Sequence, residues 1–387
     1  MTWPVRSAAP ALGARSASAR ERERMVRDFV DLCALESPSG RERAVADHLS
    51  RALGEIGLEV REDGSGAETG ADAGNLIATL PAPPGARTIM LCAHMDTVPL
   101  AAPVEVVERD GAFANANEAI LGADNKAALA VILAVLRALA AAPSRIGIEI
   151  VFTTCEERAL AGAKALDRGA LAAEYGFVFD HASPIGDVIL AAPTYYRVEG
   201  RFRGQAAHAG IRPEAGRNAI AAAAAAVSAL DLGRLDEETT ANVGRIEGGT
   251  APNVVAERCR VELEARSLDH ERATEVVAGI VDAFSDAASD HECDVETIVD
   301  EQFRGYRVPR SAPPVAVAAR ALETVGIEPR YVATGGGSDA NVFQSAGLPC
   351  VNVANGTERN HQPDERVSRA ALETMLDVAL AIVAAAE

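Results

Sequence analysis

The chain has 387 residues, of which 48% are hydrophobic and 24% are charged, and its formal net charge is −19. This length favours two domains, and the apolar content is typical of a globular protein. The strong negative charge argues against nucleic acid and against an anionic membrane surface as partners. The sequence also has no apolar run long enough to suggest a membrane span.

The cysteines and the first 20 residues indicate in which cellular compartment we expect the protein. The six cysteines are far apart in the sequence and show neither zinc-finger spacing nor a dense disulfide framework, so we expect free thiols and a cytoplasmic protein. Residues 1–20 contain no acidic residue and lack the continuous apolar core of a signal peptide, which predicts a disordered leader.

Helical and strand-like segments alternate through the first half of the chain. Helical spacing occupies residues 21–35, 41–53, 122–139 and 159–166, and strand-like apolar runs occupy 76–80, 88–92, 146–152 and 177–179. The same alternation returns after residue 309. Strands that alternate with helices predict an α/β domain with a mainly parallel mixed sheet.

The pattern changes between residues 194 and 309. There the expected order is a strand at 195–202, a helix at 213–230, strands at 242–247 and 256–266, a helix at 271–288 and a strand at 294–301. This β-α-β-β-α-β order is typical of a ferredoxin-like α+β unit. We therefore predict a catalytic α/β domain at 21–193 and 310–387, interrupted by an inserted α+β domain at 194–309.

Histidines and acidic residues follow the predicted strands of the α/β domain or begin its helices. These residues are His94 and Asp96, Asp124, Glu156 and Glu157, Asp180, and His361. Because the carboxyl ends of parallel strands meet at one edge of a sheet, we expect these side chains to converge. The donors suit zinc and related ions, and their number favours two ions that share a bridging carboxylate. Taken singly, a Glu-Glu pair is usually a solvated turn and an aspartate at a helix start is usually a cap.

Seven segments together resemble a known enzyme family. They are LCAHMDTVP, LGADNKAALA, VFTTCEERALAGAKAL, FVFDHASP, GQAAHAGIRPEAGRNAI, GGTAPNVVAERCRVELEARS and TGGGSDANVF. The chain is similar to the di-zinc metallopeptidases that include tripeptidase T, carboxypeptidase G and aminoacylase, and it resembles the tripeptidase T-like branch most. The resemblance runs from about residue 25 to the C-terminus.

The resemblance implies two metal sites. His94, Asp124 and Asp180 would hold one ion, and Asp124, Glu157 and His361 would hold the other, with Asp124 bridging. Two zinc ions per chain are expected, and cobalt and manganese are alternatives.

Further roles near the metals also follow from the resemblance. Asp96 would orient the ring of His94, and such partners strengthen metal affinity. Glu156 would be the general base. His181 directly follows Asp180 and is a competing metal ligand.

The resemblance assigns substrate contacts to residues of the inserted domain and to a glycine-rich turn. His208 would donate a hydrogen bond to the developing oxyanion, and in dimeric members of the family this histidine serves the partner subunit. Asn253 would lie near the reacting carbonyl, and Arg266 would bind a terminal carboxylate through its guanidinium fork. Gly336 and Gly337 would allow close approach of the substrate. The inserted domain would thus act as a lid and form a homodimer.

The implied activity is hydrolysis of an amide bond in a short peptide, as in a tripeptidase T-like aminopeptidase. A carboxypeptidase or a deacylase of N-acyl amino acids would use the same groups and stays an alternative. The complete ligand set together with Glu156 disfavours a binding protein with a decayed site. A phosphate-binding loop at 335–337 is disfavoured because no Lys-Ser/Thr pair follows the glycines.

Overall fold

The computed structural model describes residues 16–142 and 144–387, which divide into two units. Unit 1 contains the described residues up to 190 together with 308–333 and 338–387, whereas unit 2 contains 191–307 and 334–337. The sequence predicts boundaries at 194 and 309 instead. Most of the predicted leader, residues 1–15, lies outside the described residues, and its last two residues begin helix α1 (Ala19–Cys33).

A mixed sheet forms the middle of unit 1, which confirms the predicted α/β fold class. Its strands are β1 (Val60–Glu62), β2 (Leu76–Leu80), β6 (Gly147–Thr153), β3 (Thr88–His94), β7 (Tyr175–His181), β16 (Cys350–Ala354), β8 (Asp187–Ala192) and the short β14 (Tyr306–Arg307), in that spatial order, with β15 (Arg330–Ala333) also paired to β8. The central strands β6, β3, β7 and β16 are parallel. Their carboxyl ends therefore meet at one edge, as ligand sites in such sheets require.

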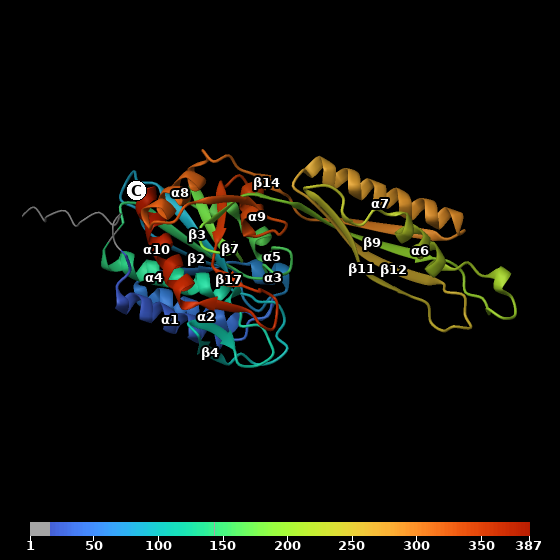
Figure 1. The fold of residues 1–387 in the computed structure, drawn as a ribbon, viewed down its shortest axis with the longest axis horizontal. Helices are drawn as coiled ribbons and strands as arrows, with labels where there is room; N and C mark the ends of the chain where they lie inside the picture. Colours follow the sequence, from blue (N-terminus) through green and yellow to red (C-terminus); the bar gives the residue numbers. More distant parts are fainter. Residues whose placement is uncertain (1–15, 143) are drawn as a thin grey trace, which may run out of the picture. The chain divides into compact units, whose positions relative to one another are not determined.

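Helices cover both faces of this sheet (Figure 1). The main core contains residues of α1, α2 (Arg43–Ile56), α4 (Ala123–Ala141), α8 (Pro313–Thr324) and α10 (Arg369–Ala386), whereas α3 (Ser65–Thr69), α5 (Ala161–Ala165) and α9 (Asp339–Ser345) lie outside it. Neighbouring residues of β3 show the two faces, because Leu91 belongs to the main core and Cys92 faces Asp339 of α9. Helix α4 is apolar on all sides and is buried along almost its whole length.

A second, smaller sheet of unit 1 carries the C-terminal part of the site. It is antiparallel, and its strands are β17 (Thr357–Glu358), β18 (Arg366–Ser368), β5 (Ala112–Asn115) and β4 (Val106–Arg109), in that order. The sequence patterns do not predict this sheet, because its strands are only two to four residues long. The loop that contains His361 connects β17 to β18.

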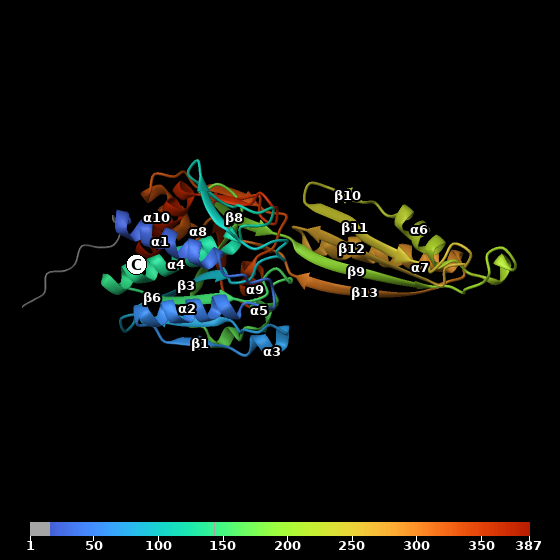
Figure 2. The same cartoon turned by 90° about the horizontal axis from the view of Figure 1, so that it is seen from below.

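Unit 2 is an antiparallel sheet with two helices packed on one face. The strand order is β10 (Gly233–Arg234), β11 (Thr239–Gly248), β12 (Arg258–Ser267), β9 (Thr194–Arg203) and β13 (Asp294–Phe303), as Figure 2 shows. Helices α6 (Ala219–Ala229) and α7 (His270–Asp290) share a core with the inward side chains of β9 and β12. The element order is the predicted β-α-β-β-α-β, with the short β10 as an addition.

One predicted helix of unit 2 begins later than its sequence suggests. The prediction of a helix at 213–230 is wrong at its start, because α6 begins at Ala219. The Asn218 side-chain oxygen accepts hydrogen bonds from the main-chain N–H groups of Ile220 and Ala221, which caps the helix there. Within 16–142 and 144–387, no helix is both long and apolar enough to cross a membrane.

Candidate metal centre

Five predicted ligands converge at the carboxyl edge of the central sheet of unit 1. His94 ends β3, Asp180 is the next-to-last residue of β7, and Glu157 lies in the turn that follows β6. Asp124 is the second residue of α4, and the loop between β17 and β18 supplies His361. The approach of these residues from five segments agrees with the expectation drawn from the parallel strand ends.

Asp124 lies between the two histidines. Its Oδ1 is 3.4 Å from Nε2 of His94, and its Oδ2 is 3.5 Å from Nε2 of His361. The same nitrogen of His94 is 3.6 Å from Oδ1 of Asp180, and that of His361 is 2.8 Å from Oε1 of Glu157. The donors thus form two sets that share Asp124, with one of its oxygens in each. A carboxylate that bridges two ions requires this arrangement.

The ring of His94 presents the correct nitrogen to this cluster. Its Nδ1 lies 2.9 Å from the main-chain carbonyl oxygen of Asp96. A carbonyl can only accept a hydrogen bond, so Nδ1 is the donor. In the neutral ring, the lone pair is then on Nε2, which faces Asp124 and Asp180.

The carboxylate of Asp96 lies near that ring, and it also accepts hydrogen bonds from the turn that contains Glu156 and Glu157. Its Oδ1 is 3.5 Å from Nδ1 of His94, but it accepts a hydrogen bond from the main-chain N–H of Glu156 at 2.9 Å. Its Oδ2 accepts from the N–H of Glu157 at 3.1 Å and from the hydroxyl of Ser39 at 2.6 Å. Asp96 therefore holds the turn that carries both glutamates.

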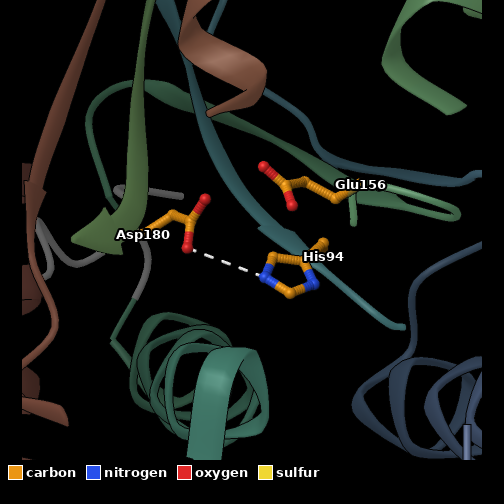
Figure 3. Close-up of side chains that lie close together, drawn as sticks. All are labelled: His94, Glu156 and Asp180. Atoms are coloured by element: carbon orange, nitrogen blue, oxygen red, sulfur yellow. Dashed lines mark ion pairs between the residues drawn. The ribbon is translucent and has the colours of Figure 1, made fainter. Parts of the chain in front are cut away.

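Glu156 points into the same space as His94 and Asp180, as Figure 3 shows. The donor atoms of these three residues all lie within 4.8 Å of one another. Burial of Glu156 and the negative charge of Asp180 raise the pKa of the Glu156 carboxyl well above its ordinary value. A carboxyl group with a raised pKa is suited to accept a proton from water.

The cluster also shifts the pKa values of its other members. Burial raises the pKa of Asp180 to about 8, and the negative charge of Asp124 contributes to this shift. Hydrogen bonds to Asp124 and Glu157 raise the pKa of His361 to about 10. Burial lowers the pKa of His94, but its contacts with Asp124 and Asp180 outweigh this effect and raise it well above the ordinary value. Imidazole and carboxylate groups gathered in this way are the donors that zinc and related divalent ions prefer, and binding of an ion would displace their protons.

Two buried glutamates support the centre, and the sequence patterns do not give them a role. Glu365, only 1% exposed, accepts hydrogen bonds from the main-chain N–H groups of Leu121, Gly122 and Asp124 at 2.8, 2.8 and 2.9 Å. It thereby fixes the segment that carries the Asp124 carboxylate. The position of Glu365 in an acidic pair near His361 is a weak sequence signal, because such pairs are usually solvated.

The second glutamate, Glu42, holds the other end of the Glu156 turn. It is fully buried, and its Oε1 accepts hydrogen bonds from the main-chain N–H groups of Gly40 and Cys155 at 2.8 and 3.1 Å. Nothing in its sequence context distinguishes it from an exposed helix-start glutamate. His181, the competing ligand, belongs to neither of the two groups of donor atoms that lie within 4.8 Å of one another among the described residues, and His361 does not belong to them either. His361 nevertheless contacts Asp124 and Glu157 of the cluster.

The predicted substrate residues of unit 2 fall into two groups. His208 and Asn253 are exposed and adjacent: His208 forms a bridge with Val254, and the N–H of Ala209 donates to the carbonyl of Asn253 at 3.0 Å. Both lie beyond the Arg258 end of β12.

Arg266 lies near the opposite end of β12, about 27 Å from Arg258 at the ordinary rise of a strand. Its guanidinium donates to the carbonyl of Gly335 at 3.2 Å. Gly336 and Gly337 belong to the same turn, and a Cβ at Gly337 would overlap the ring of Phe303. Packing within unit 2 is therefore one reason for glycine at this position.

Comparison with known proteins identifies the family. The sequence model of peptidase family M20/M25/M40 matches residues 90–385, which is more than half of the chain. The chain belongs to peptidase family M20/M25/M40. Members of this family are metal-dependent, so this M20-family protein is a metallopeptidase, as its donor cluster also indicates.

Two solved structures and one curated protein are similar to this M20-family protein over nearly its whole length. Aminopeptidase PepT from Bacillus cereus ATCC 10987 shares 38% sequence identity, with a TM-score of 0.86 and coverage of 94% of this chain and 98% of that one. A tripeptidase from Staphylococcus aureus subsp. aureus Mu50 shares 32% identity, with a TM-score of 0.90 and coverage of 95% and 99%. The uncharacterized protein YqjE of Bacillus subtilis (strain 168) is 37% identical over 362 residues, which cover 93% of this chain and 98% of its relative. These similarities confirm the predicted family.

Proposed function

We propose that this metallopeptidase is a tripeptidase T-like aminopeptidase that hydrolyses short peptides with two zinc ions. The observation that carries the two-ion proposal is the position of Asp124, whose two oxygens face different histidines. The substrate class is supported by similarity to solved structures described as an aminopeptidase and a tripeptidase.

Each residue of the centre would have a separate role in the hydrolysis. Two bound ions would polarise the scissile carbonyl and lower the pKa of the attacking water. Glu156 would accept the proton of that water and pass it to the leaving nitrogen. Asp96 holds the N–H groups of both Glu156 and Glu157, so the base and one ligand keep a fixed spacing.

The substrate contacts of unit 2 favour a homodimer. We propose that His208 would stabilise the oxyanion together with Asn253, and that Arg266 would bind the terminal carboxylate with Gly336 and Gly337 nearby. A tripeptide is at most about 11 Å long. The part of β12 from Arg258 to Arg266, about 27 Å long, separates Arg266 from the pair formed by His208 and Asn253. Within one copy of unit 2, Arg266 is therefore too far from His208 and Asn253 for all three to contact the same tripeptide. This distance supports the proposal that a partner subunit provides His208 and Asn253.

The outer edge of β11 is the proposed dimer surface. Strand β10 pairs only with Thr240 and Ala241, so the rest of the outer edge of β11 has no strand partner in the described part of the chain. Ile246 on this edge is 51% exposed, and Ile220 of α6, which lies against Gly249, is 39% exposed. An open strand edge with exposed apolar side chains is suited to pairing with a second copy.

The dimer surface can be tested by light scattering after size-exclusion chromatography. Ile246→Lys should convert a dimer to a monomer, because it places a charge in the proposed interface. Ile298→Lys is the matched control, since Ile298 is 36% exposed on β13 at the opposite edge of the same sheet. A dimer that survives Ile246→Lys and dissociates with Ile298→Lys would show that the proposed edge is wrong.

Metal analysis and a substrate panel test the proposed activity. We expect about two ions per chain. Activity on tripeptides should be lost on chelation and partly restored by zinc, cobalt or manganese. Preferential hydrolysis of N-acetyl amino acids would instead support the deacylase alternative, and release of a C-terminal residue would support a carboxypeptidase. Full activity in exhaustively metal-free protein would refute the metal mechanism.

Subunit mixing tests the origin of His208. His208→Ala and Glu156→Gln chains should each be nearly inactive. A mixed dimer would contain one site with an intact Glu156 from one chain and an intact His208 from the other, so activity should return on mixing. No recovery after verified subunit exchange would place His208 in the site of its own chain.

A further inference from the structure

The guanidinium of Arg266 is already engaged by a carboxylate of its own strand. Its Nε and Nη2 donate to Oε1 and Oε2 of Glu264 at 3.2 and 3.1 Å, and its Nη1 donates to the carbonyl of Gly335 at 3.2 Å. A guanidinium has five N–H donors, so two have no partner among the described residues, one on each terminal nitrogen. Arg266 can thus bind another anion only beside Glu264.

Other residues of unit 2 hold the plane of this guanidinium in place. Its carbon lies 4.2 Å from the centre of the Tyr195 ring, which is a cation–π distance. The Tyr195 ring packs edge-on against Phe303, with ring centres 5.4 Å apart. Burial raises the pKa of Tyr195, and the nearby charge of Glu264 contributes to the shift. Arg266 is therefore oriented before any substrate arrives.

We propose that Glu264 is a specificity-determining residue that competes with the substrate carboxylate for Arg266. This inference rests on the proposed role of Arg266 as the anchor of a terminal carboxylate. A substrate carboxylate bound to the two remaining donors would lie close to the carboxylate of Glu264, and like charges at short range repel. Glu264 thus orients Arg266 and at the same time weakens its affinity for free acids relative to substrates with a neutral terminus.

Glu262 offers a matched control on the same strand and face. It lies two residues before Glu264, so both side chains point to the same side of the sheet. Its carboxylate pairs with Arg197 at 2.7 Å and Arg260 at 3.1 Å, and it has no ion pair with Arg266 among the described residues. Neutralising Glu262 removes the same charge from unit 2 without changing the immediate partner of Arg266.

The test compares KM for trialanine and for trialanine amide. Glu264→Gln removes the charge but keeps an acceptor for Arg266, so KM for trialanine should fall about three- to tenfold while KM for the amide stays unchanged. Glu264→Ala also removes the hydrogen bonds that orient Arg266, so it should lose this gain. Glu262→Gln should leave both constants unchanged. Equal changes for the two substrates, or a higher trialanine KM in Glu264→Gln, would show that Glu264 has only a structural role.

A binding measurement and one further variant separate this inference from the proposed function. Calorimetric titration of trialanine into Glu156→Gln and into the double variant Glu156→Gln/Glu264→Gln should show the same three- to tenfold tighter binding without turnover. Arg266→Ala should weaken trialanine more than its amide. If it does and Glu264→Gln has no selective effect, only the inference about Glu264 fails. If Arg266→Ala affects both substrates equally, the anchor role and the inference fail together.

Discussion

Charged side chains are positioned in different ways in the metal centre of unit 1 and on the uncovered sheet face of unit 2. In unit 1, the carboxylates of Asp96 and Glu365 are buried and accept hydrogen bonds from main-chain N–H groups. In unit 2, the charges pair mainly through the tips of side chains. The contact between Arg201 and Glu296, for example, is 3.2 Å long between side chains that are 51% and 67% exposed.

This difference in burial predicts which charges matter most for the site. A buried carboxylate that accepts main-chain N–H groups fixes the backbone, so its removal moves the ligands attached to that backbone. An exposed ion pair is screened by water and contributes little to stability. We therefore expect substitutions in the two regions to differ strongly in size of effect.

The largest effect is expected in the Glu156-Glu157 turn. Glu156→Gln should keep both metals but lower kcat by about 10²- to 10⁴-fold, because the amide cannot accept the proton of water. Glu157→Gln should instead weaken metal binding, since Glu157 faces His361 at 2.8 Å. Turnover rates and metal titration of the two variants distinguish base from ligand. If Glu156→Gln weakened metal binding and Glu157→Gln lowered only kcat, Glu157 would be the base and Glu156 the ligand.

The covered face of the unit 2 sheet should respond more strongly than its charged face. Phe284 of α7 is fully buried, and its ring centre lies 5.4 Å from that of Phe202 on β9. Phe284→Ala should lower the free energy of unfolding by about 3–5 kcal/mol, because it leaves a cavity in the smaller core. Urea denaturation followed by circular dichroism measures this loss. A change below about 1 kcal/mol would contradict the assignment of this face as a core.

Substitution of Glu365, which fixes the segment at Asp124, should have an intermediate effect. Glu365→Gln brings an amide NH₂ group toward three main-chain N–H donors, so the segment at Asp124 should shift. We expect metal affinity to fall about 10- to 100-fold, with an unchanged circular dichroism spectrum. Glu358→Gln, which alters a half-exposed partner of Arg366, is the control and should leave metal affinity unchanged. Equal metal affinities in both variants would show that Glu365 does not support the centre.

The smallest effect is expected for the exposed pairs of unit 2. Glu296→Gln removes one partner of Arg201, which keeps its contact with Glu199 at 2.6 Å. The free energy of unfolding should stay close to that of the unchanged protein, and added salt should reduce any difference further. Urea midpoints at low and high salt measure it. A clear loss of stability that persists at high salt would mean that these charges act as a coupled network.

Much of the centre could be predicted because its residues follow local patterns. His94, Glu157 and Asp180 come at or just after the ends of apolar runs, and those runs form parallel strands whose carboxyl ends meet. Glu365 and Glu42 could not be found in this way. Their roles depend on burial against main-chain groups far away in the sequence, and no local pattern records such contacts.

By itself, the sequence determined the alternation of elements, the inserted α+β segment and the types of metal donor, because these depend on local composition and periodicity. Only the tertiary structure decided that the two oxygens of Asp124 face different histidines and that Asp96 holds the Glu156-Glu157 turn. It also decided that Arg266 and His208 lie toward opposite ends of β12. These distances join residues far apart in the chain, so strand register and helix packing set them rather than local spacing.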